Sequence, residues 1–215
     1  MSTTEIRHPV SPAAALERLR DGNARFVREL RSLDAFGGRL RRQALVDGQS
    51  PFAIVLSCAD SRVPAEIVFD CGLGDLFVVR VAGNIVAPSL VGSIEFAAAT
   101  FGTRLVVVMG HTSCGAVAAT LDVVQGATPP SPNLRDLVDR IAPAVHAAGP
   151  GSRAEVLRAA THNNIRASVD KLRHGSRILE ERVEDGRLVV VGAEYALEDG
   201  EVRFFDAEEA LLRAA

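Results

Sequence analysis

Three residues with zinc-type side chains follow two apolar stretches of the chain. Cys58 follows the run 52–56, while His111 and Cys114 follow the run 105–109. Thiolate sulfur and imidazole nitrogen suit zinc, because this ion accepts soft and borderline donors in a tetrahedral arrangement and needs no redox chemistry. Three protein ligands leave the fourth tetrahedral position open, which separates a catalytic zinc from a structural one. We therefore expect one Zn²⁺ per chain, provided the fold brings these three residues together.

Asp60 and Arg62 lie close to the first ligand in the sequence and allow two arrangements. Residues two apart in an extended segment share a face, so Cys58, Asp60 and Arg62 can all point into one site. An arginine can hold the Asp60 carboxylate in a planar bidentate pair, which leaves the fourth metal position free for water. Without that pair, Asp60 can itself become a fourth ligand and close the site.

The elements that must position these residues read as an α/β fold. Apolar runs predict strands at 52–57, 75–80, 104–109, 188–193 and 201–205. A turn at Asp199-Gly200 makes the last of these an antiparallel edge strand. Helices are predicted from Pro12, from Pro88 and at 114–124, 134–148, 152–173, 176–184 and 206–215. This alternation predicts a mostly parallel central sheet flanked by helices. Chemistry in such sheets collects at the carboxyl ends of the strands, where the two ligand loops are expected to meet.

The chain is expected to form a single domain with an N-terminal helical arm at 1–50 and an α/β zinc catalytic core at 51–215. Ser11 and Pro12 suit the N-cap and first position of a helix, and Gly22-Asn23 is a candidate interruption of it. The arm either packs on its own domain or embraces a second subunit, and the sequence leaves both open. The helix from Pro88 carries small and apolar residues nearly all round, which predicts burial and a candidate subunit interface.

Composition and charge exclude several classes of protein. The 215 residues are 47% hydrophobic and carry a net charge of −3, which is ordinary for a globular protein and gives no basic footprint for nucleic acid. No apolar run is long enough to span a membrane, and the N-terminus lacks the apolar core of a signal peptide. Three cysteines argue against a disulfide framework and favour the reducing cytoplasm.

The pattern Cys-x-Asp-x-Arg followed by His-x-x-Cys, each after an apolar strand, resembles the β-class carbonic anhydrases. The similarity extends from Gln49 to Asp122 and includes the segments 61–66, 74–80 and 110–115. The resemblance implies a zinc-dependent lyase that reversibly hydrates carbon dioxide to bicarbonate and a proton through zinc-bound hydroxide. In this mechanism Asp60, fixed by Arg62, accepts the hydroxide's hydrogen and aims its lone pair at the substrate.

The resemblance also implies a substrate pocket and an oligomer. Gln49 is the implied amide donor to carbon dioxide or bicarbonate, and the Gly115 backbone lies nearby. Phe77, Ala82 and, from a partner chain, Phe96 are the implied pocket wall, although the two phenylalanines are equally well explained as core aromatics. A shared pocket implies a homodimer or a dimer of dimers.

One branch of that family contains a non-catalytic bicarbonate site built around a tryptophan just before the first cysteine motif. Val55 occupies that place here, the chain contains no tryptophan, and Arg80 alone matches the site. We therefore expect an open zinc site near neutral pH, with Asp60 paired to Arg62. Two thiolates cancel the formal charge of the metal, so we expect activity that rises above neutral pH rather than a flat profile.

Other readings of the same residues remain possible. The scaffold could hydrolyse carbon disulfide or carbonyl sulfide, or it could bind structural zinc without catalysis through a permanent fourth ligand. A Cys114 nucleophile with His111 as base would leave Cys58 without a role. The loop 110–115 lacks the Lys-Ser/Thr ending of a phosphate-binding loop. Cys71 matches no ligand position and is interpreted as a packed thiol. Four histidines lack partners at metal spacing and are interpreted as surface or helix histidines: His8, His146, His162 and His174.

Overall fold

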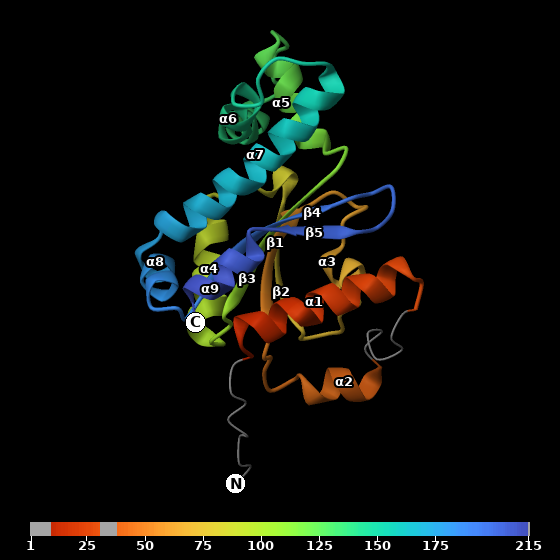
Figure 1. Ribbon diagram of the computed structural model, residues 1–215, viewed down its shortest axis with the longest axis vertical. Helices are drawn as coiled ribbons and strands as arrows, with labels where there is room; N and C mark the ends of the chain where they lie inside the picture. Colours follow the sequence, from red (N-terminus) through yellow and green to blue (C-terminus); the bar gives the residue numbers. More distant parts are fainter. Residues whose placement is uncertain (1–9, 31–37, 215) are drawn as a thin grey trace.

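A five-stranded sheet forms the centre of the computed structural model, which describes residues 10–30 and 38–214 (Figure 1). Its strand order is β2-β1-β3-β4-β5; the first four strands are parallel and β5 is antiparallel to β4. The mostly parallel sheet with an antiparallel edge strand is confirmed, and each predicted strand start lies one residue early. The strands are β1 (Ala53–Cys58), β2 (Leu76–Val81), β3 (Leu105–His111), β4 (Val189–Tyr195) and β5 (Val202–Phe205).

Helices cover both faces of this sheet. Successive side chains of a strand point to opposite faces, and every residue of β1 and β3 is buried, so both faces must be covered. Val55 belongs to one core cluster, while Ile54 and Leu56 belong to another. The helices on the Val55 face are α1 (Pro12–Val27), α3 (Ala65–Val68) and α9 (Ala207–Arg213). Those on the other face are α4 (Pro88–Thr100), α7 (Arg153–His174) and α8 (Arg177–Glu184).

A third group of helices extends beyond the carboxyl ends of the strands, where Figure 1 shows it at the top of the molecule. It consists of α5 (Gly115–Val124), α6 (Pro132–His146) and the first half of α7. Their apolar side chains pack around Cys58 and Cys114. Helix α6 begins two residues earlier than predicted, because the Ser131 hydroxyl accepts a hydrogen bond from the Leu134 N–H and caps the helix.

Helix α1 is continuous through Gly22-Asn23, so the predicted interruption is wrong. A Cβ atom on Gly22 would lie 1.9 Å from the carbonyl oxygen of Phe69, so glycine permits this close approach. The buried Asn23 amide donates hydrogen bonds to the carbonyls of Val68 and Gly200, and its oxygen accepts one from the Val202 N–H. These two residues join α1 to α3 and to the β4–β5 hairpin.

The helices of the predicted arm and the helix from Pro88 differ in how far they pack on their own chain. Helix α1 packs on the core of its own chain, whereas α2 (Arg39–Ala44) buries none of its residues. Helix α4 buries only Ile94, Ala97 and Ala98 within one chain, and Phe96 is 53% exposed. The burial all round that was predicted for α4 is therefore not met by this chain alone.

Parts of the predicted elements lie outside the described residues: His8, the stretches 1–9 and 31–37 of the arm, and Ala215 at the end of the last helix. Within 10–30 and 38–214, no helix combines the length and the hydrophobicity needed to cross a bilayer.

Candidate metal centre

The two ligand loops meet because β1 and β3 are parallel neighbours in the sheet. Their register pairs Ser57 with Met109, so both strands end at the same edge. The sulfurs of Cys58 and Cys114 and a ring nitrogen of His111 all lie within 4.8 Å of one another, and all three residues are buried. The expected juxtaposition of Cys58, His111 and Cys114 is therefore present in the fold.

The environment of His111 leaves one of its nitrogens ready to bind a cation. Its Nδ1 lies 2.8 Å from the carbonyl oxygen of Thr112, and a carbonyl can only accept, so Nδ1 carries the hydrogen. The lone pair is then on Nε2, which is buried and makes no hydrogen bond within the described chain. An unsatisfied buried polar atom costs about 1–3 kcal/mol. A borderline-soft cation held by this nitrogen and two sulfurs would satisfy it, so the donor set fits zinc.

The two sulfurs are hydrogen-bonded to each other, and this bond shifts their pKa values in opposite directions. The hydrogen bond with Cys114 lowers the pKa of Cys58 to about 4, against the effect of burial. The same hydrogen bond, reinforced by burial, raises the pKa of Cys114 well above its ordinary value. One sulfur is thus a thiolate while its neighbour keeps a proton, which a cation binding both would displace.

Asp60 is fully engaged by Arg62. Its Oδ1 accepts the Arg62 backbone N–H at 2.9 Å and Nε at 3.0 Å, and Oδ2 accepts the second guanidinium nitrogen at 2.8 Å. These bonds hold the pKa of Asp60 well below its usual range. The same guanidinium donates to the Ser113 carbonyl at 3.2 Å, so Arg62 also connects the two ligand loops. Asp60 remains beside the cluster, with Oδ2 3.9 Å from His111 Nε2.

Arg80 fixes the backbone of the first ligand loop. It donates to the carbonyl of Cys58 at 3.1 Å and to the carbonyl of Asp60 at 2.7 Å. Arg80 thus stabilises the path of the chain between Cys58 and Asp60.

The turn after β2 contributes a contact to the cluster that the sequence analysis missed. Gly83 donates its backbone N–H to Cys58 Sγ at 3.3 Å. Gly83 has φ of 72°, and a Cβ atom there would lie 2.6 Å from Ile141 Cδ1, so this position needs glycine. A Gly-Asn pair shortly after a strand is a turn signal, which could have pointed to this segment.

The residues expected to bind substrate fall into two groups. Ala82 precedes Gly83 in the turn beside Cys58, and Gly115 follows Cys114 at the start of α5. Phe77, by contrast, pairs with Ile54, four residues before Cys58 and hence about 13 Å away along the sheet. Gln49 precedes β1 at the same far edge, where it lines a cavity of about 550 Å³. Phe96 contacts Phe77 of its own chain, with ring centroids 6.3 Å apart.

Among the described residues, Cys71, His162 and His174 are not members of the Cys58–His111–Cys114 group. Burial raises the pKa of Cys71 to about 12, and its thiol lies 3.3 Å from the Phe69 carbonyl as a donor. His162 lies 3.2 Å from a carboxylate oxygen of Glu194, and His174 interacts with the Asp170 carbonyl. Within the described residues, the only group of three or more His, Cys, Asp or Glu side chains with metal-binding spacing is the one at Cys58.

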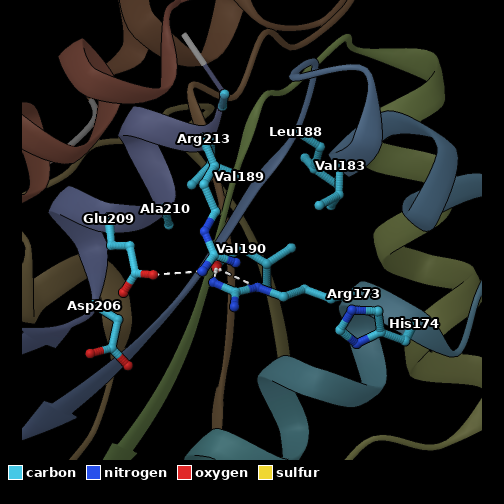
Figure 2. Close-up of a pocket in the computed structure, with 11 residues that line it drawn as sticks. Arg173, His174, Val183, Leu188, Val189, Val190, Asp206, Glu209, Ala210 and Arg213 are labelled. Atoms are coloured by element: carbon cyan, nitrogen blue, oxygen red, sulfur yellow. Dashed lines mark hydrogen bonds and ion pairs between the residues drawn. The ribbon is translucent and has the colours of Figure 1, made fainter.

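Figure 2 shows a separate cavity of about 210 Å³ at the amino end of β4. Arg173 donates two hydrogen bonds to the Val190 carbonyl there, and Arg213 is paired with Glu209. Val189 pairs with Leu105 at one end of β3, whereas His111 is at the other end, about 20 Å away. Its arginines therefore take no part in the metal centre.

Comparisons with known proteins agree with this architecture. A model of the family described as carbonic anhydrase matches residues 53–202. Carbonic anhydrase 2 of Mycobacterium tuberculosis is 41% identical over 197 residues, which cover 88% of this chain and 91% of that protein. The carbonic anhydrase of Mycolicibacterium smegmatis is 42% identical over 196 residues, with coverage of 89% and 92%.

Two solved structures extend the comparison to the fold. The β-carbonic anhydrase CafA of Aspergillus fumigatus superposes with a TM-score of 0.69 at 26% identity, covering 94% of this chain and 95% of its own. The β-carbonic anhydrase CcaA does so with a TM-score of 0.69 at 26% identity, covering 91% and 97%. Together with the Cys-His-Cys group at the carboxyl edge of the sheet, these relatives establish that the chain is an enzyme of the carbonic anhydrase family, in its β class.

Proposed function

We propose that this chain catalyses the reversible hydration of carbon dioxide to bicarbonate and a proton, with one zinc ion held by Cys58, His111 and Cys114. The observation that carries the proposal is a buried donor triad next to a carboxylate that is already committed to an arginine. Because Asp60 is held by Arg62, it is not available as a fourth ligand, which favours a catalytic over a structural zinc.

A bound zinc ion supplies Lewis acidity that lowers the pKa of water and makes hydroxide available near neutral pH. Asp60 stays ionised because Arg62 lowers its pKa, so it can accept a hydrogen bond from the nucleophile throughout the physiological range. Its Oδ2 lies 3.9 Å from His111 Nε2, so Asp60 would lie beside a metal ion held by that nitrogen and could orient water that such an ion activates. Arg62 contributes by positioning this carboxylate, and Arg80 by holding the loop that carries it.

We further propose that a second copy of the chain completes the substrate pocket. Ala82 and Gly115 border the cluster in one chain, whereas Gln49, Phe77 and Phe96 lie at the far edge of the sheet. A homodimer, or a dimer of dimers, can bring that edge of one copy against the centre of another. The proposed arm 1–50 supports this arrangement, because its helix α2 buries no residue within its own chain. A monomer in sedimentation experiments that hydrates carbon dioxide at full rate would contradict it.

Thiolate ligands need a reducing environment, so we propose a cytoplasmic location, which fractionation of the source cells would test. The alternative activity on carbon disulfide or carbonyl sulfide has no specific contact in its favour. The non-catalytic alternative requires a permanent fourth ligand, and the carboxylate of Asp60, 3.9 Å from His111 Nε2, makes three hydrogen bonds to Arg62 instead.

The test pairs zinc analysis with stopped-flow carbon dioxide hydration for the wild type and two variants, Cys114→Ser and Asp60→Asn. Two matched controls are available in the chain. Cys71→Ser changes a buried thiol outside the cluster, and Asp136→Asn changes an aspartate held by Arg140 in the same bidentate way. The controls are expected to keep both zinc and activity.

Cys114→Ser is expected to lose zinc, because a hydroxyl replaces one of two sulfur ligands. Asp60→Asn is expected to keep zinc and to lose about 100-fold or more in kcat, since an amide cannot serve as the same acceptor. Wild-type activity is expected to rise above neutral pH. Normal hydration by Asp60→Asn would refute the role given to Asp60, and wild-type protein without stoichiometric zinc would refute the proposed site.

A further inference from the structure

We propose that Asn164 of α7 is a positioning residue for the Cys58 sulfur, an inference that rests on the proposed zinc site. The Asn164 side-chain amide donates to the Gly83 carbonyl at 2.7 Å. Gly83 in turn donates its N–H to Cys58 Sγ at 3.3 Å. One residue of backbone therefore connects a side chain of the long helix α7 to a ligand sulfur at the end of β1.

The turn that carries this contact needs an outside restraint. Gly83 and Asn84 both have positive φ angles, 72° and 42°, and the second is unusual for a residue with a side chain. Asn164 holds the carbonyl of Gly83, and Ser168 holds the carbonyl of Asn84 at 3.1 Å. Asn164 and Ser168 are four residues apart, so they lie on one face of α7 and together hold the peptide groups that follow Gly83 and Asn84.

Helix α7 is a rigid base for these contacts. It begins at a capping box made by Ser152 and Glu155, and it packs along β3 and β4. Asn164 is 3% exposed, so water cannot replace its hydrogen bond to Gly83 if the side chain is removed. Helix α7 thus restrains the peptide group on the carbonyl side of Gly83, and through the Gly83 Cα atom it limits the directions that the N–H can take.

A hydrogen bond to a ligand sulfur affects metal binding in two ways. It fixes the direction of the sulfur lone pairs, and it withdraws negative charge from the thiolate. Loss of such an outer contact typically lowers metal affinity by about 10–100-fold. Removing the Asn164 amide is therefore expected to act on Cys58 through Gly83, without any change in the three ligand residues.

The preceding residue provides a matched control. The Asn163 side-chain amide donates to the Ala144 carbonyl in α6 at 3.2 Å. Asn163→Ala and Asn164→Ala therefore make the same chemical change at adjacent positions of one helix, and each removes an amide-to-carbonyl hydrogen bond. Of these two asparagines, only Asn164 contacts the turn at Gly83.

The experiment measures zinc affinity by chelator competition and the thiolate-to-cobalt charge-transfer absorption of Co²⁺-substituted full-length protein. Asn164→Ala is expected to bind zinc about 10-fold more weakly than the wild type and to shift the cobalt band. Ser168→Ala should shift both in the same direction and by less. Asn163→Ala should stay within about twofold of the wild-type affinity, with an unchanged cobalt spectrum.

The proposal is overturned if Asn164→Ala matches Asn163→Ala in both measurements. Asn164→Asp keeps the side-chain size but replaces the donor by an acceptor, so it serves as a second variant and should weaken zinc binding at least as much. If Asn164→Ala does not fold, Asn164→Asp decides the question alone. Wild-type protein that binds neither zinc nor cobalt would instead refute the proposed function, and the two failures are thereby distinguished.

Discussion

Replacing Gly83 by alanine tests whether the close approach of Ile141 is what makes glycine necessary in the turn beside Cys58. The new Cβ atom would lie 2.6 Å from Ile141 Cδ1 and 3.2 Å from the Ala116 Cβ, and the residue would have to keep φ of 72°. Ile141→Val removes the Cδ1 atom itself. The four proteins wild type, Gly83→Ala, Ile141→Val and the double variant therefore form a cycle that separates the contact from the backbone strain.

The expected free energies of unfolding follow from these contacts. The left-handed conformation costs an alanine about 1–2 kcal/mol. Displacing the buried Ile141 adds about 1–3 kcal/mol, so Gly83→Ala should lose about 2–5 kcal/mol. Ile141→Val alone should lose about 0.5–1.5 kcal/mol. The double variant keeps the strain but loses the clash, so it should be more stable than the sum of the singles by about 1–3 kcal/mol.

Urea unfolding measures these values at one protein concentration, because subunit association would otherwise contribute to apparent stability. Zinc content of the same samples tests whether the shifted Gly83 N–H affects the site. Losses that add within about 0.5 kcal/mol would show that the Ile141 contact does not limit the turn, and the reasoning from the 2.6 Å approach would be refuted.

Three further predictions concern other residues. Asn23→Ala removes three hydrogen bonds and should lower the free energy of unfolding by about 3 kcal/mol. The exposed control Asp21→Ala should change it by under about 0.5 kcal/mol. Equal effects of the two variants in urea titrations would contradict this prediction. Because the hydrogen bonds from Arg62 lower the pKa of Asp60, its contribution to stability is complete above the unfolded-state pKa of about 3.9 and is lost as the pH falls below it. Wild-type stability should therefore fall more steeply than that of Asp60→Asn between about pH 5 and pH 3, and parallel curves would argue against the ion pair. After chelator treatment at neutral pH, iodoacetamide should modify Cys58 before Cys71, whose pKa burial raises to about 12; peptide mass spectrometry showing the reverse order would be inconsistent with these pKa shifts.

The strands and the ligand cluster could be predicted because their signals are local. Ile54, Leu56 and Val107 belong to short continuous apolar runs, and such runs are typical of buried parallel strands. Cys58 and His111 each follow such a run, and the rule that chemistry collects at the carboxyl ends of parallel strands was enough to place them together.

The features that could not be predicted depend on contacts between distant segments. Gly22 looks like a helix breaker by itself, and only the carbonyl of Phe69 explains why glycine is required there. Phe77 and Gln49 have residue types that suit a substrate pocket, but their distance from Cys58 depends on the strand register. The role of Gly83 depends on the direction of one N–H group, which residue type does not specify.

Asn23 has a consequence for the order in which the chain is made. Its hydrogen-bond partners Gly200 and Val202 are 177 and 179 positions later in the sequence. During synthesis, α1 leaves the ribosome early but must wait for nearly the whole polypeptide before its buried amide is satisfied. A translation product that stops before β5 would therefore expose this helix and its apolar face, which makes such a truncated product a natural target for chaperones and proteases.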